Sequence, residues 1–113
     1  MLKVYLQNRP KKGNLMNDKE LYQQKKQTQL NEWKIGMIQF RTQAFAARTH
    51  MQLELNKHVK FLEGKLEEGK LKLAELAKMT GNSFEAAKKN FEIIWDSIQV
   101  AFTDTATKFK ALN

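Results

Sequence analysis

Residues 80–83 read Thr-Gly-Asn-Ser and separate two long stretches that have a helical pattern. Glycine is common just past the end of a helix, and serine is a common N-cap of the helix that follows. No proline occurs after Pro10, and the residues before this turn are rich in Gln, Lys, Glu, Leu and Ala, which favour helix. The sequence therefore predicts a helix over residues 17–79, with Asn17 or Asp18 as its N-cap, a turn at 80–83, and a helix over residues 84–111.

A connection this short places two consecutive helices antiparallel, so the predicted fold is an all-α helical hairpin, a long coiled coil. Apolar residues in both helices recur at alternating spacings of three and four, as on a helix face that is buried. Folding about residues 81–82 sets Gly69 against Ile94 and Trp95, where a missing side chain would make room for the indole ring. The predicted hairpin core comprises Leu62, Leu66, Gly69, Leu73, Leu76, Phe91, Ile94, Trp95, Ile98 and Phe102.

The second predicted helix is too short to cover the first, since it reaches back only to about residue 53. An apolar stripe over about 30 Å of helix would then have no partner within the chain, and such stripes mark protein–protein interfaces. The sequence therefore predicts a homo-oligomer, an oligomeric helical bundle with parallel and antiparallel arrangements both open. The predicted oligomer interface comprises Leu30, Trp33, Met37, Phe40, Ala44, Ala47 and Met51.

The apolar pattern changes register in the middle of the first predicted helix. Residues 47, 51, 55 and 59 follow at consecutive spacings of four. Such a stutter locally unwinds a coiled coil. We therefore expect a straightened segment over residues 47–59.

The net charge of +8 is concentrated near the N-terminus, because residues 1–50 hold ten bases and three acids. Residues 1–16, which carry four bases and no acid, read as an irregular basic arm. A basic half of this kind favours docking to another protein with an acidic surface, and nucleic acid or an anionic membrane is the alternative. The predicted contacts for an acidic partner are Arg9, Lys11, Lys12, Lys25, Lys26, Lys34, Arg41 and Arg48.

The sequence offers little for catalysis or for cofactor and metal binding. It has no cysteine and no glycine-rich phosphate loop. His50, Glu54 and His58 recur at spacings of four, but surface polar residues explain them better than a metal site, and Ser83 reads as a helix cap. We therefore expect no catalytic, cofactor or metal site. No apolar run of about 18 residues occurs, and the first fifteen residues are too polar for a signal peptide, so we expect a cytoplasmic location or an internal compartment.

Three stretches resemble a family of small bacterial coiled-coil proteins, namely Leu30-Asn31-Glu32-Trp33, residues 72–78 (Lys-Leu-Ala-Glu-Leu-Ala-Lys), and residues 81–109. The third includes Gly81-Asn82-Ser83 and Trp95-Asp96-Ser97-Ile98. The resemblance covers about residues 17–110, and some members of that family are cyanobacterial-type stress-response proteins. It implies a coiled coil with no catalytic residues and a role in a stress response.

Together these observations predict a non-enzymatic interaction protein that scaffolds or assembles a larger protein complex. The alternative is a binder of nucleic acid or of an anionic membrane surface through the basic N-terminal half.

Overall fold

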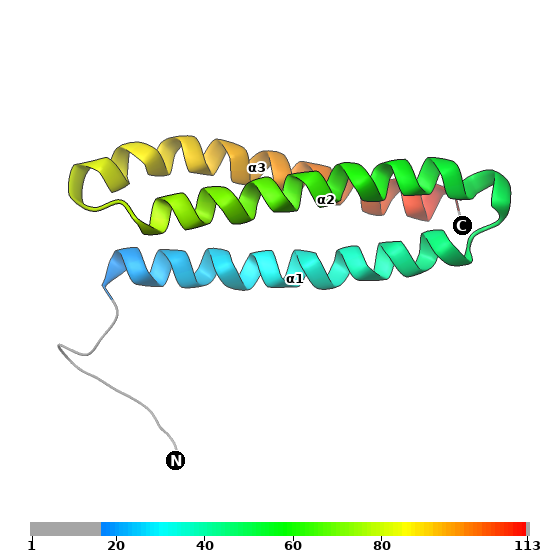
Figure 1. The fold of residues 1–113 in the computed structure, drawn as a ribbon, viewed down its shortest axis with the longest axis horizontal. Coiled ribbons are helices and arrows are strands. Elements are labelled where there is room, and N and C mark those ends of the chain that lie inside the picture. The colour runs from blue at the N-terminus through cyan, green and yellow to red at the C-terminus, as the bar shows by residue number, and fades with distance from the viewer. Residues whose placement is uncertain (1–16, 113) are drawn as a thin grey trace, which may run out of the picture.

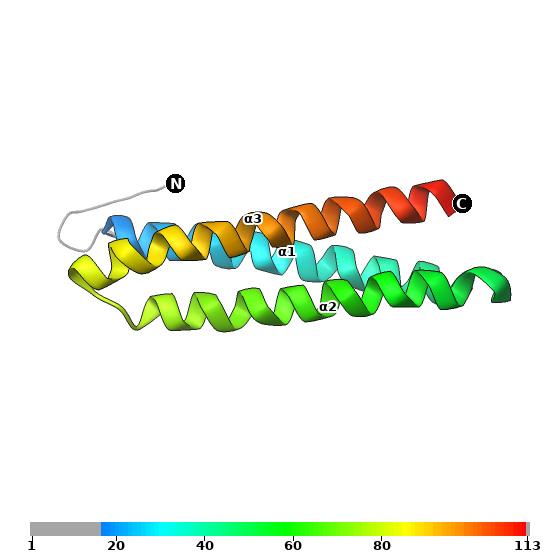
Figure 2. The same cartoon turned by 90° about the horizontal axis from the view of Figure 1, so that it is seen from above.

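The computed structural model describes residues 17–112, which form three α-helices and contain no strand. The helices are α1 (Asp18–Ala46), α2 (Thr49–Ala77) and α3 (Gly81–Leu112). The chain reverses direction at each of the two short connections, so α1 and α3 run the same way and α2 runs against both (Figure 1). In the view from above α2 and α3 lie in front of α1, and α2 packs against both other helices (Figure 2). The all-α class and the bundle packing are as predicted, but the chain does not form a hairpin of two helices.

Helix α1 begins with a complete capping box, which confirms the expected N-cap. The Asn17 side chain accepts a hydrogen bond from the Glu20 backbone N–H at 2.8 Å, and the Asn17 backbone N–H donates to Glu20 Oε1 at 3.2 Å. Asp18 and Glu20 also place negative charge in the first turn, where the helix dipole favours it. The start of the bundle is therefore encoded locally.

The helix predicted over residues 17–79 is wrong, because the chain turns back at Ala47 and Arg48. Both residues are extended, with ψ of 161° and 148°, and α2 begins at Thr49. The Gln52 side-chain amide donates to the carbonyl oxygens of Phe45 and Ala47 at 3.0 and 2.9 Å, so it satisfies groups that the helix end leaves open. The straightened segment expected at 47–59 is also wrong, since the register change begins where the chain turns.

The second connection ends at a glycine but lies slightly earlier in the sequence than the predicted turn at residues 80–83. The helix of α2 ends at Ala77, and α3 begins at Gly81, whose φ of +57° is in the left-handed region that glycine adopts without strain. Ser83 therefore lies in the first turn of α3 and is not its N-cap. Lys19 Nζ, on α1, donates to the carbonyl oxygens of Ala77 and Met79, which ties α1 to the end of α2.

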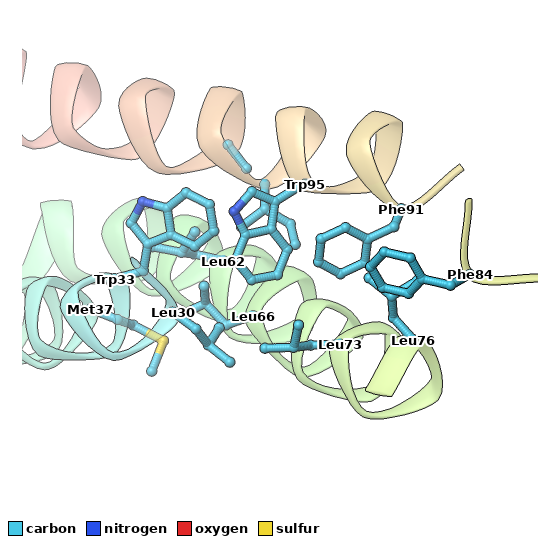
Figure 3. Close-up of a cluster of buried hydrophobic side chains, with 12 residues drawn as sticks. Leu30, Trp33, Met37, Leu62, Leu66, Leu73, Leu76, Phe84, Phe91 and Trp95 are labelled. Atoms are coloured by element: carbon cyan, nitrogen blue, oxygen red, sulfur yellow. The ribbon is translucent and has the colours of Figure 1, made fainter. Parts of the chain in front are cut away.

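Large side chains from all three helices fill the centre of the bundle (Figure 3). All ten residues of the predicted hairpin core lie in this cluster or against it, with Ile94 and Phe102 only partly buried. A Cβ atom at Gly69 would lie 2.7 Å from Ile98 Cδ1 and 3.3 Å from Trp95 Cζ3. This close approach agrees with the expectation that Gly69 makes room for Trp95. The buried apolar residues of the cluster are Leu30, Trp33, Met37, Leu62, Leu66, Leu73, Leu76, Phe84, Phe91, Trp95, Ile98 and Ala101.

Aromatic rings separate α1 from α3 along most of their length. The ring centroids of Trp33 and Trp95 lie 5.1 Å apart, and those of Phe40 and Phe109 lie 4.9 Å apart. The indole N–H of Trp95 donates to the Gln29 side-chain oxygen, so the buried ring keeps a hydrogen bond. A Cβ atom at Gly36 would overlap the ring of Phe102, so this glycine is a second notch that the sequence-based pairing did not predict.

Candidate interaction surface

The predicted oligomer interface lies inside the chain. Leu30, Trp33, Met37 and Ala44 are buried, while Phe40, Ala47 and Met51 are partly buried against a second cluster. That second cluster contains Ala44, Leu55, Val59 and Phe109. The premise that the stripe lacks an intrachain partner is therefore wrong, because α2 folds back onto α1 and α3 covers the remainder. Self-association stays a prediction, and this stripe no longer supports it.

A half-buried polar cluster lies between α1 and α3, beside the aromatic rings. The Tyr22 hydroxyl donates to Glu92, whose carboxylate also lies 3.7 Å from Lys26 Nζ. Burial lowers the pKa of Lys26, although the nearby Asp96 carboxylate partly opposes this shift. Burial and then Asp96 raise the pKa of Glu92. Lys88 Nζ lies 4.6 Å from the Tyr22 ring centroid. These groups engage one another, so the cluster joins α1 to α3.

A different set of apolar side chains points away from the bundle on α1. Ile35, Ile38 and Phe45 are 60%, 53% and 85% exposed. Their spacings of three and seven keep them within a sector of about 80° at 100° per residue. We call these three residues the outer row. It lies in a stretch, residues 33–53, that contains Lys34, Arg41 and Arg48 and no acid.

A continuous groove runs between α1 and α2 beside the outer row. Three hollows follow one another along it, and neighbouring hollows share Lys70 and then Arg41. The two hollows that share Lys70 hold about 500 Å³ each. Because Ile38 and Phe45 line the groove, the outer row and the groove form one surface. We call this the α1–α2 groove, and it extends from Glu20 and Ala77 to Phe45 and Gln52.

The middle of the groove carries opposite charges on its two sides. Lys34 and Arg41 line it from α1, and Glu63 and Glu67 line the same hollow from α2. Arg41 donates through Nε and Nη2 to Glu63 Oε2 at 2.8 and 2.6 Å. Both side chains of this pair are partly exposed, so the pair contributes little to the stability of the fold.

The bases predicted to contact an acidic partner lie in three different situations. Arg9, Lys11 and Lys12 fall outside the described residues. Lys25 and Arg48 are exposed and Lys34 is half-buried. Arg41 is paired with Glu63, and Lys26 lies in the polar cluster with Glu92. The structure therefore does not bring the described bases together into one patch.

Residues 17–112 show neither a metal-binding cluster nor a membrane-spanning helix. Within that range, no three His, Cys, Asp or Glu side chains are grouped so that they could hold a metal ion. His58 Nε2 lies 3.1 Å from Glu54 Oε2, one turn away on α2. None of the three helices is both long enough and apolar enough to span a bilayer.

Sequence reasoning missed the outer row because it assigned the unpartnered role to the stripe now found in the core. The spacing of Ile35, Ile38 and Phe45 was available as a signal, and so was the absence of acids over residues 33–53.

Comparisons of the chain with protein-family models, curated proteins and solved structures found no match. The family resemblance therefore stays a prediction, and the candidate site rests on the geometry of the chain itself.

Proposed function

We propose that the protein is a non-enzymatic interaction module that scaffolds or assembles a larger protein complex. The observation that supports this is the outer row. Exposed apolar side chains scattered singly are ordinary, but three on one helix face beside a groove form a continuous surface of the kind that partner proteins cover. Phe45 is the most exposed large apolar side chain of the described residues.

The proposed partner is a protein with an acidic surface. Residues 33–53 present Lys34 and Arg48 beside the outer row, and the third base of this acid-free stretch, Arg41, is paired with Glu63 of α2. Charges at the rim of an apolar contact speed association and select partners more than they add affinity. The apolar row would then supply affinity, and the bases would supply selectivity.

Site-specific photo-crosslinking in cells of the native source tests this proposal. A photoreactive phenylalanine replaces Ile35, which is 60% exposed, and the matched control replaces Ile93, which is 67% exposed on α3 and lies away from the groove. We expect position 35 to crosslink to an acidic protein that mass spectrometry identifies, and position 93 to give no such product. Equal crosslinking at both positions, or none at position 35, would contradict the proposal.

The second candidate function is binding to nucleic acid or to an anionic membrane surface. The same acid-free stretch favours it, because an apolar row among bases suits a layer of anionic headgroups. Titration with DNA and with vesicles of anionic lipid at two salt concentrations tests it. This function requires binding that weakens steeply with salt and is lost when Arg48 is replaced by Glu. Binding that is absent or insensitive to salt would exclude it.

A further inference from the structure

We infer that the α1–α2 groove is closed by the same groove of a second copy of this chain, with the two-fold axis parallel to the helices. The inference rests on the proposed function, since it takes the groove to be an interaction surface, and it names one occupant. The three helices of one chain leave this groove open along its length. In this dimer α1 and α2 of both copies would form a four-helix core, in which every neighbouring pair of helices is antiparallel.

The charges of the groove select this arrangement. Lys34 and Arg41 line the same hollow as Glu63 and Glu67, so the four residues lie within one segment of the bundle about 10 Å long. A two-fold axis parallel to the helices sets α1 of one copy opposite α2 of the other at unchanged height. Arg41 and Glu63 already pair within each chain, and in this dimer the side of the groove with Lys34 and Arg41 also faces the side with Glu63 and Glu67 of the other copy, twice.

The other face-to-face arrangement is unfavourable. A two-fold axis perpendicular to the helices sets α1 against α1 and α2 against α2. The carboxylates of Glu63 and Glu67, near the middle of α2, would then approach those of the second copy. Like charges placed opposite each other at an interface cost binding energy and exclude that register. Charge alone therefore separates the two possible dimers.

Apolar side chains lie where this dimer would need them. Ile38 and Phe45 line the groove from α1, and Phe45 is 85% exposed in the single chain. In the proposed arrangement Phe45 meets the start of α2 of the second copy, near Gln52 and Asn56, which line the same hollow. Ile35 lies at the edge of this face and stays available for a different partner.

The acids of the groove argue against the other occupants. An anionic bilayer or a nucleic acid laid along the groove would meet Glu63 and Glu67 as well as the bases. Both carboxylates disfavour phosphate groups, although Arg41 of the same chain already pairs with Glu63, whereas a second copy would set bases opposite them. A second copy is the occupant whose charge pattern is known to match, because it carries the same pattern.

Two charge-swap variants of the full chain test the inference by sedimentation. One carries Lys34→Glu and Arg41→Glu, and the other carries Glu63→Lys and Glu67→Lys. We expect the unchanged protein to dimerise and each variant alone to dissociate about tenfold or more readily, since acids or bases then face each other across the interface. An equimolar mixture of the two variants should dimerise again, because its α1 and α2 charges are opposite in both contacts.

A matched control carries Lys89→Glu and Lys110→Glu, two exposed bases of α3, and should dimerise as the unchanged protein does. Circular dichroism verifies that each variant is helical, and Phe45→Ser provides a second test that leaves the charges unchanged and should also weaken the dimer. A monomeric unchanged protein, or a mixture that fails to dimerise, would overturn the inference. A monomer that still crosslinks through position 35 to an acidic protein would leave the proposed function standing.

Discussion

Helix α1 carries apolar side chains on two faces, and the two faces lie in different surroundings. The inner face, with Leu30, Trp33 and Met37, packs against α2 and α3 and is at most 9% exposed. The outer row, with Ile35, Ile38 and Phe45, is at least 53% exposed. Both faces follow helical spacing, so the pattern alone does not decide which one is buried. The position of the turn at Ala47 and Arg48 decides it, because that turn returns α2 along the inner face.

The two faces also separate stability from binding. Residues of the inner face bury large side chains within one chain, so their removal should unfold the protein. Residues of the outer row contact little within the chain, so their removal should leave the fold intact and affect only partners. Substitutions on either face can therefore test whether the inner face serves stability and the outer row serves binding.

The largest expected effect is on the inner face. Trp33→Ala should lower the free energy of unfolding by about 3–5 kcal/mol, because it leaves a cavity between α1 and α3. Phe45→Ala on the outer row should change it by about 0.5 kcal/mol or less. Urea unfolding followed by circular dichroism measures both. Similar losses for the two variants would contradict the division of α1 into a buried and an exposed face.

The next effect concerns two glycines on α2, of which Gly69 faces the core and Gly64 faces outward. Gly69→Leu should lower the free energy of unfolding by about 2–3 kcal/mol, because a side chain there overlaps Ile98 and Trp95. Gly64→Leu should raise it by about 0.5–1 kcal/mol, since nothing lies within 4 Å of a Cβ there and leucine favours helix. Thermal unfolding reports the sign of each change. Equal and small effects would remove the notch at Gly69.

A smaller effect is expected at the turn that brings α2 onto the inner face. Gln52→Ala should cost about 1 kcal/mol, because the carbonyl oxygens of Phe45 and Ala47 lose the amide that they share. The exposed Gln43 of α1, changed to Ala, is the control and should cost nothing measurable. Hydrogen exchange should quicken first in the residues around the turn. Unchanged exchange there would show that the amide does not hold the turn.

The smallest effect belongs to the polar cluster at the edge of the inner face. The folded-state pKa of Glu92 is raised by burial and by Asp96, so its contribution to stability is present below its unfolded pKa and is lost as pH rises through the folded pKa. Glu92→Gln should therefore gain stability relative to the unchanged protein on going from about pH 4 to about pH 7. We expect a gain of about 0.5 kcal/mol or less, because the carboxylate is 40% exposed. The urea midpoint at the two pH values measures it, and the opposite sign would contradict the pKa direction.

The two turns of the bundle differ in how well the sequence predicts them. Gly81 marks the second turn, since its left-handed backbone suits glycine, and the sequence predicts that turn within a few residues. The first turn has neither glycine nor proline, and a side chain five residues beyond Ala47 completes it, so composition predicts a continuous helix. A continuous helix would leave the inner face without a partner.

The same error explains what was missed in the candidate site. Without the first turn, α1 could not be placed against α3, so the notch at Gly36 and the contact of Phe40 with Phe109 were not predicted. The core of α2 and α3 needs only the second turn, and those residues were predicted individually. The outer row became recognisable only after the inner stripe was found to be buried.

The position of the first turn is the central claim, and a distance between two spin labels tests it most directly. The chain has no cysteine, so Gln24→Cys and Ala74→Cys give labels at these two positions only. Both residues line the same hollow of the α1–α2 groove. Dilution with unlabelled protein restricts the measured distance to one chain.

The three-helix bundle predicts a label separation of about 20 Å or less, because packed helices have axes about 8–10 Å apart. A continuous helix over residues 17–79 would separate the labels by about 75 Å, at 1.5 Å per residue. Pulsed electron–electron double resonance distinguishes the two without any knowledge of partners. The short distance supports the three-helix bundle, and the long one would contradict it and return the inner face of α1 to the role of an oligomer interface.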